Sequence, residues 1–88
     1  PVVLPGTVIL YEQEARTGAL WLAEHFRRQN LAVQSMKRNT GRALEDYQDM
    51  VRRRGQRNLL YLEGDGRTVR VMDMVKGSED IILLSEYE

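Results

Sequence analysis

The stretch TVILYEQEARTGALWLAEHFRRQNLAVQSM, residues 7–36, decides the fold of this chain. It is the first part of a pattern in which short apolar runs alternate with amphipathic helical segments. The predicted order is strand 7–11, helix 15–30, strand 31–36, helix 42–54 and strand 59–62. Strands that alternate with helices of this length are typical of right-handed βαβ units. We therefore predict a parallel sheet with two crossover helices.

The first helical segment has an apolar stripe with a period of 3.6 residues. Arg27 and Arg28 stand in its last turn, where cations complement the helix dipole, and Asn30 is expected to end it in the left-handed conformation. The residues expected to face the sheet are Ala15, Ala19, Leu22, Ala23 and Phe26.

The second helical segment has acidic residues first and basic residues last, which also suits the helix dipole. Thr40 is predicted as its N-cap, and Gly55 is predicted to follow its end in the left-handed conformation. Arg52, Arg53 and Arg54 fill the last turn. Its buried stripe is expected at Leu44, Tyr47 and Val51, with Met50 beside it.

The C-terminal part is predicted to add two antiparallel strands. Residues 63–66 (EGDG) are expected to form a hairpin turn with positive φ at both central positions, and residues 76–80 (KGSED) a second turn before a strand over 81–84. The predicted fold class is therefore α/β: one domain over residues 7–88, with a mixed five-stranded sheet flanked by helices. The second strand, 31–36, is less apolar than the first and is expected at an edge.

Composition excludes several classes of function. The 88 residues carry 13 basic and 13 acidic side chains, so no global field draws the chain to nucleic acid or to anionic membrane. The absence of cysteine and the single histidine exclude zinc–thiolate and multi-histidine sites. No apolar run reaches the roughly 20 residues of a transmembrane helix. We expect no membrane association, no metal, no cofactor and a cytoplasmic location.

The start of the chain has the composition of a linker. Residues 1–6 (PVVLPG) lack an initiator methionine and read as an extended segment. We therefore expect the chain to be a C-terminal fragment of a longer protein.

The residues that suggest chemistry each have a simpler interpretation. The stretch 64–66 (GDG) resembles a phosphate loop, but phosphate-binding glycine turns join a strand to a helix, and this one joins two predicted strands. His25 is interpreted as a partly solvated surface residue, and the arginine run 52–54 as dipole compensation. The pairs Glu12/Glu14 and Glu45/Asp49 show no sign of burial that would separate their pKa values. No catalytic residue is predicted.

Two features suggest binding. Leu20 and Trp21 lie off the sheet-facing stripe of the first helix, so they form a candidate interface, although a linker or a C-terminal helix would cover them equally well. The three parallel strands also deliver polar residues to one edge of the sheet, which is the usual ligand site of open α/β sheets. The candidate ligand residues there are Glu12, Gln13, Lys37, Arg38, Asn39 and Arg42.

Several stretches share the pattern of one protein family. They are residues 7–11, 19–27, 31–33, 40–47, 55, 59–64 and 69–74. Together they resemble the C-terminal anticodon-binding domain of histidyl-tRNA synthetases, in which a "leu-ala-glu-x-leu-arg" helix precedes a glycine and the second strand. The likeness spans nearly the whole chain, but it lacks the helix that commonly closes that domain.

The sequence departs from the synthetases in its second helix. Lysines and a glutamine typically open this helix in the family, whereas Glu45, Asp46 and Asp49 stand here, and acids oppose phosphate binding. The resemblance therefore favours the synthetase-like regulatory subunit of ATP phosphoribosyltransferase, in histidine biosynthesis. It implies a non-catalytic domain whose partner is the catalytic phosphoribosyltransferase subunit or a second copy.

Two alternatives stay open at this point. One is a true anticodon-binding domain, in which Lys37, Arg38, Asn39 and Arg42 contact tRNA. The other is a small-ligand-binding α/β module that uses the same edge of the sheet.

Overall fold

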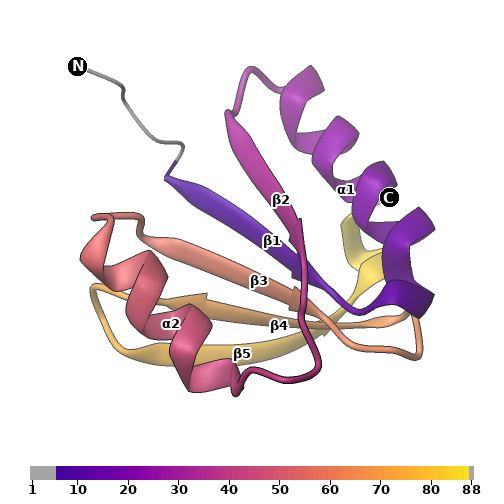
Figure 1. Cartoon of the computed structure of the whole chain (residues 1–88). Coiled ribbons are helices and arrows are strands. Elements are labelled where there is room, and N and C mark those ends of the chain that lie inside the picture. Colours follow the sequence, from indigo (N-terminus) through magenta and orange to yellow (C-terminus); the bar gives the residue numbers. More distant parts are fainter. Residues whose placement is uncertain (1–5, 88) are drawn as a thin grey trace.

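The computed structural model describes residues 6–87 and places a five-stranded sheet between two helices (Figure 1). The strands are β1 (Thr7–Tyr11), β2 (Val33–Lys37), β3 (Asn58–Leu62), β4 (Thr68–Asp73) and β5 (Ser78–Leu83). The helices are α1 (Arg16–Arg28) and α2 (Leu44–Arg53), with short 3-10 helices η1 (Gln13–Ala15) and η2 (Leu84–Tyr87). Apart from Gly6, the predicted linker lies outside the described residues.

The sheet is mixed, and its strand order is β2-β1-β3-β4-β5. β1 runs parallel to β2 and to β3, while β4 is antiparallel to both β3 and β5. The predicted α/β fold, with its mixed five-stranded sheet, is confirmed. β2 stands at an edge, as its weaker apolar character indicated. Within the part of the chain that is described, no helix has the length and apolar character needed to cross a membrane.

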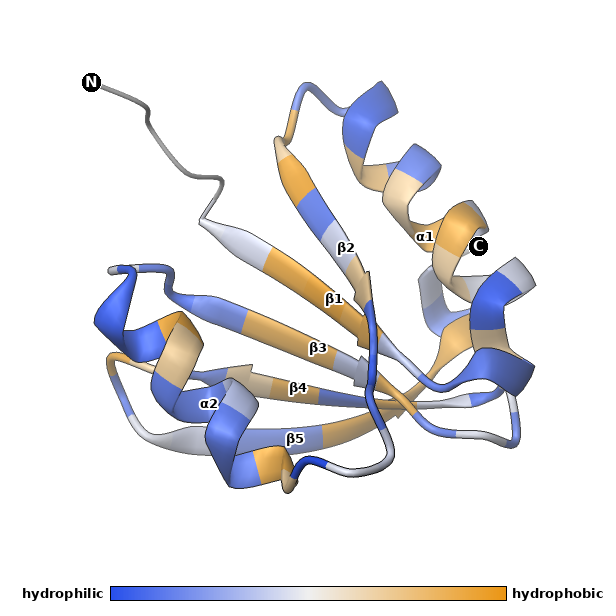
Figure 2. Cartoon of the chain, viewed as in Figure 1, coloured by the Kyte–Doolittle hydropathy of each residue, from blue (hydrophilic) through white to orange (hydrophobic). Residues whose placement is uncertain are grey.

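The central strand β1 is buried on both faces, which explains why its sequence is apolar without alternation. Ile9 faces the α1 side with Leu60 of β3, whereas Val8 and Leu10 face the α2 side. All three β1 side chains are fully buried. Figure 2 shows the apolar stretches of β1 and β3 in the middle of the sheet. Two separate cores therefore form, one under each helix.

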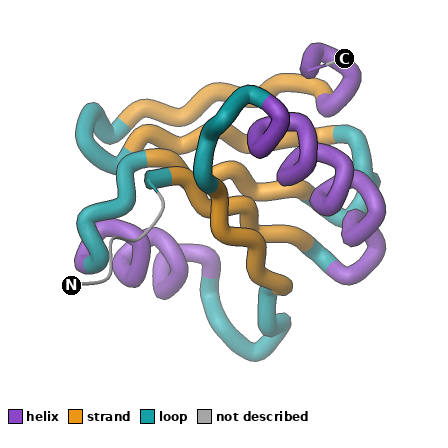
Figure 3. The backbone as a smooth tube through the Cα atoms, turned by 90° about the horizontal axis from the view of Figure 1, so that it is seen from above, coloured by secondary structure: helices purple, strands orange, loops and turns teal. Residues whose placement is uncertain are grey.

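α1 packs closely on the sheet through small side chains. Ala19, Leu22 and Ala23 are fully buried, as the helical periodicity predicted. Phe26 lies at the margin of this core, half-buried against the Tyr87 ring, with ring centroids 5.6 Å apart. Phe26 therefore packs on the sheet-facing core as predicted, but it is only half-buried, and the Tyr87 ring of η2 lies against it. Figure 3 shows α1 and α2 on opposite sides of the sheet.

α2 begins later than predicted, and Thr40 is not its N-cap. The N-cap is Ala43, which makes no side-chain capping bond. The Asn39 side chain accepts the Gly41 N–H at 2.9 Å, and the Asn39 carbonyl accepts the Arg42 N–H at 3.0 Å. These bonds hold residues 39–42 in a turn of their own, so the helix starts only after it. The buried stripe is confirmed at Tyr47 and Val51, and Leu44 is half-buried.

The first helix also differs at its ends. The predicted segment 15–30 divides into η1 and α1, and α1 ends at Arg28. Asn30 has φ 62° and Gly55 has φ 73°, so both predicted left-handed terminators are confirmed. Leu31 lies outside β2 and is half exposed, because the turn at Asn30 carries it away from the sheet.

The hairpin between β3 and β4 differs in detail from the prediction, since only Gly66 in it has positive φ. The Asp65 carboxylate stabilises the turn, because it accepts hydrogen bonds from the Thr68 hydroxyl at 2.7 Å and from the Arg67 and Thr68 N–H groups. These bonds, chiefly that of the hydroxyl, lower the pKa of Asp65 to about 2.

The turn before β5 lies earlier than predicted, and residues 78–80 belong to the strand. Asp73 accepts the Val75 and Lys76 N–H groups, and Gly77 has φ 71° and bonds the Asp73 carbonyl. The Asp73 side chain thus closes the turn within residues 73–77, which frees the next residues to pair with β4.

Substitution of Leu22 tests the assignment of the α1 core. Because its side chain is fully buried, Leu22→Ala should lower the free energy of unfolding by about 2–5 kcal/mol. Leu20→Ala, two positions away and 52% exposed, is the matched control and should change it by no more than about 0.5 kcal/mol. Urea unfolding followed by circular dichroism measures both. Equal losses for the two variants would contradict the orientation of α1.

Candidate functional site

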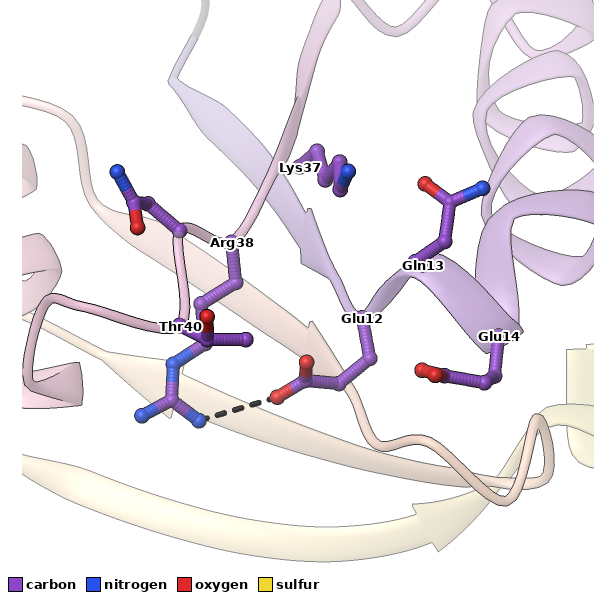
Figure 4. Close-up of a pocket in the computed structure, with 7 residues that line it drawn as sticks. Glu12, Gln13, Glu14, Lys37, Arg38 and Thr40 are labelled. Carbon is purple, nitrogen blue, oxygen red and sulfur yellow. Dashed lines mark hydrogen bonds and ion pairs between the residues drawn. The ribbon is translucent and has the colours of Figure 1, made fainter.

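The carboxyl ends of β1 and β2 meet at one edge of the sheet around a pocket of about 270 Å³ (Figure 4). Parallel register places residue 11 of β1 beside residue 37 of β2, so the residues that follow each strand converge. The lining residues are Glu12, Gln13, Glu14, Lys37, Arg38, Asn39 and Thr40. The structure therefore brings together five of the six residues predicted at this edge, whereas Arg42 is not among the lining residues. That they bind a ligand stays a prediction.

The floor of this edge is a network of Glu12, Arg38 and Tyr61. Arg38 Nη1 donates to Glu12 Oε1 at 3.1 Å and to the Tyr61 hydroxyl at 2.8 Å, and the Tyr61 hydroxyl donates to Glu12 Oε1. The Arg38 and Glu12 side chains are only 25% and 19% exposed. Glu12 directly follows β1, Arg38 directly follows β2, and Tyr61 lies in β3. The network therefore links the three parallel strands to one another.

The network raises the pKa values of Tyr61 and Arg38. Burial and the hydrogen bond to Glu12 raise the pKa of the Tyr61 phenol, so the phenol stays neutral through the physiological range. The bond to the Tyr61 hydroxyl, with help from Glu12, raises the pKa of the Arg38 guanidinium. Arg38 is thus a permanent cation whose charge is already matched by a carboxylate.

A second tyrosine holds the loop between β2 and α2. The Tyr47 hydroxyl accepts the Asn39 N–H at 2.6 Å, and the Arg42 guanidinium lies over the Tyr47 ring at 5.1 Å from its centroid. Arg38 Nη2 also approaches the Arg42 carbonyl at 3.5 Å. The loop that carries the polar edge is therefore held by an aromatic residue of the α2 core.

Sequence reasoning missed both tyrosines as members of this edge. Tyr47 was predicted only as a buried helix residue, and Tyr61 only as part of an apolar strand. A signal was present, because a buried tyrosine hydroxyl usually finds a hydrogen-bond partner. The polar residues after β1 and β2 were the nearest candidates for that partner.

The charge around this edge is mixed. Lys37 and Arg42 are exposed cations, and Glu14 is an exposed acid on the same rim. The acids Glu45, Asp46 and Asp49 are exposed on α2, and Asp49 forms an ion pair with Arg52 at 2.9 Å. No group of three or more histidine, aspartate or glutamate side chains within residues 6–87 is arranged to hold a metal ion.

The candidate interface residues lie elsewhere, on the outer face of α1. Leu20 is 52% exposed and Trp21 is 38% exposed. The Trp21 ring stacks on His25, with centroids 5.3 Å apart and planes 16° apart. His25 in turn meets Phe26 and Tyr87 edge to face, so Trp21 is the exposed end of an aromatic cluster. This surface does not contribute to the pocket at the sheet edge.

No protein-family model and no curated protein matches the sequence, but solved structures share its fold. Histidyl-tRNA synthetase from Nostoc sp. PCC 7120 matches with a TM-score of 0.79 and 16% identity, over 96% of this chain and 21% of that chain. Giardia lamblia prolyl-tRNA synthetase in complex with prolyl-adenylate matches with a TM-score of 0.74 and 11% identity, over 91% and 20%. Apo S. aureus histidyl-tRNA synthetase matches with a TM-score of 0.60 and 17% identity, over 90% and 24%.

At these sequence identities, the matches establish a shared fold but not a shared function. The chain spans about a fifth to a quarter of the length of each synthetase. The predicted anticodon-binding-like architecture is thereby confirmed at the level of the fold.

Removal of the Tyr61 hydroxyl tests the edge network. Tyr61→Phe should lower the free energy of unfolding by about 1.5–3 kcal/mol, because the hydroxyl bonds two charged groups in a largely covered site. Thermal or urea unfolding measures the change. Tyr11→Phe, on the α1 side of β1, is the matched control and should have a smaller effect. If both variants are as stable as the wild type, the network does not hold the strands together.

Proposed function

We propose that this chain is a non-catalytic, tRNA-synthetase-like domain that serves subunit assembly, as in a regulatory subunit of ATP phosphoribosyltransferase. The shared fold with histidyl- and prolyl-tRNA synthetases supports the synthetase-like part of this proposal. The choice between assembly and RNA binding depends on the charges of the sheet edge.

The observation that carries the proposal is the neutralised guanidinium of Arg38. Phosphate affinity comes from cations that exchange counterions for phosphate. Arg38, the half-buried cation of the edge, already shares its Nη1 group between Glu12 and Tyr61. A phosphate that engaged it would have to displace a partly covered carboxylate. The edge therefore lacks a preformed phosphate site at its centre.

The exposed apolar surface in the middle of α1 supports the assembly role. Leu20 and Trp21 add apolar surface on the side of α1 that points away from the sheet, where the fold itself needs none. Tryptophan is enriched at the centres of protein interfaces. The proposed partner is the catalytic subunit of a phosphoribosyltransferase or a second copy of the parent protein.

A second candidate is RNA binding by an anticodon-binding domain. It is favoured by the synthetase fold and by the exposed Lys37, Asn39 and Arg42 around the pocket. Against it stand the exposed acids of α2 and the zero net charge of the chain. The two candidates use different surfaces, so separate variants distinguish them.

The RNA-binding test uses labelled histidine tRNA and the 88-residue chain. In about 150 mM salt, where surface charges are screened beyond roughly 8 Å, we expect no submicromolar binding. If binding is seen, the variants Lys37→Ala and Arg42→Ala identify the edge, and Lys76→Ala in the β4–β5 turn is the matched control. Submicromolar binding that the first two variants weaken and the control leaves unchanged would establish the RNA-binding alternative.

The assembly test uses Trp21→Ala in the full-length parent protein. Loss of an interface tryptophan should weaken subunit association by about 2 kcal/mol or more, while the unfolding midpoint of the 88-residue chain stays nearly unchanged. Sedimentation velocity measures association. Val75→Ala, at a residue 73% exposed on the β4–β5 turn, is the control. Unchanged association together with a large loss of stability would assign Trp21 to the fold.

A further inference from the structure

The outer edge of β5 is the second free edge of the sheet. β5 pairs with β4 on one side, and no other strand within residues 6–87 pairs with it. Such an edge presents a row of backbone N–H and C=O groups that can pair with another strand. The strand is also fairly long for an edge, since it spans Ser78–Leu83.

The hydrogen bonds of β5 show which groups face outward. The Leu84 N–H bonds the Arg67 carbonyl at 2.7 Å, which lies on the β4 side. Successive N–H groups of a strand point to alternate edges, so the N–H groups of Leu83 and Ile81 point away from β4. Ile81 and Leu83 also carry exposed side chains on the α2 side of the sheet, at 65% and 52% exposure.

One of these outward groups is already occupied. The Leu83 N–H donates to Glu86 Oε2 at 2.7 Å. Glu86 is held in place by its neighbours in η2: the Leu84 N–H bonds the carbonyl of Arg67, just before β4, and Tyr87 packs against Phe26 of α1. The carboxylate is therefore fixed over the end of the strand edge.

We propose that the outer edge of β5 is a self-pairing surface for a second copy of this chain, and that the Glu86 carboxylate keeps it closed. Removal of this carboxylate joins two sheets edge to edge through antiparallel β5 strands. The proposal does not rest on the proposed function, because it involves neither the outer face of α1 nor the pocket between β1 and β2.

The sequence of β5 is complementary to itself in one antiparallel register. When Ile82 lies opposite its own copy, Ile81 of each chain lies opposite Leu83 of the other. Both residues have outward N–H groups, so these are the hydrogen-bonded pairs, and the exposed aliphatic side chains form one row. Glu79 and Asp80 then lie beyond the paired centre. Each of the two Ile81–Leu83 pairs uses the Leu83 N–H of one chain, so the Glu86 carboxylate of each chain blocks one pair.

The test compares the association of three variants of the 88-residue chain by sedimentation velocity over a range of concentrations. Glu86→Ala should associate about a hundredfold more tightly than the wild type, because each of two copies loses one competing bond and each tenfold step corresponds to about 1.4 kcal/mol. Glu86→Gln loses the charge but keeps an acceptor oxygen, and it should remain as monomeric as the wild type. Ile81→Pro added to Glu86→Ala removes an outward donor without breaking the β4 ladder, and it should restore the monomer.

Circular dichroism and urea unfolding confirm that each variant is folded. A folded Glu86→Ala chain that stays monomeric at every concentration overturns the proposal, as does a dimer that Ile81→Pro leaves intact. Equal association of the Ala and Gln variants shows that charge repulsion, and not an occupied N–H group, keeps the edge closed, and this also overturns it.

Discussion

The burial of β1 on both faces is the constraint on which the rest of the structure depends. Val8, Ile9 and Leu10 are fully buried, so one helix must cover each face of the sheet. A parallel neighbour on each side of β1 then requires crossovers, and α1 and α2 provide both the crossovers and the cover. The sheet therefore separates the α1-side core from the α2-side core.

The same parallel arrangement creates the polar edge. Three strands end side by side, and the chain must leave the hydrophobic layer there with its polar groups satisfied. Arg38 Nη1, the Glu12 carboxylate and the Tyr61 hydroxyl bond one another, and the Tyr47 hydroxyl accepts the Asn39 N–H in the next turn. These side-chain hydrogen bonds link the ends of the parallel strands to one another.

The two surfaces available for association differ in physical character. The α1 surface is an aromatic patch, in which Trp21 rests on His25, and association there would bury side-chain area. The β5 edge offers backbone hydrogen bonds, and its side chains contribute only one aliphatic row. In the proposal above, the Glu86 carboxylate occupies the Leu83 N–H and so limits pairing at the β5 edge. Within residues 6–87, no side chain covers Leu20 and Trp21 of the α1 patch in the same way.

The sequence by itself determined the α/β class, the strand order along the chain, the buried stripe at Ala19, Leu22 and Ala23, and the left-handed residues Asn30 and Gly55. These features follow from local periodicity and from backbone preferences, which neighbouring residues decide. Tertiary structure alone decided that Asn39 delays α2, that Tyr61 bridges Glu12 and Arg38, that Phe26 is covered by η2, and that Glu86 closes β5. The Tyr61 and Phe26 contacts join segments that lie far apart in the sequence, so only the packed sheet fixes them. The Asn39 and Glu86 bonds are local, but the segments that carry them are held by the Tyr47 hydroxyl and by the Arg67 carbonyl, and no local pattern contains those two distant contacts.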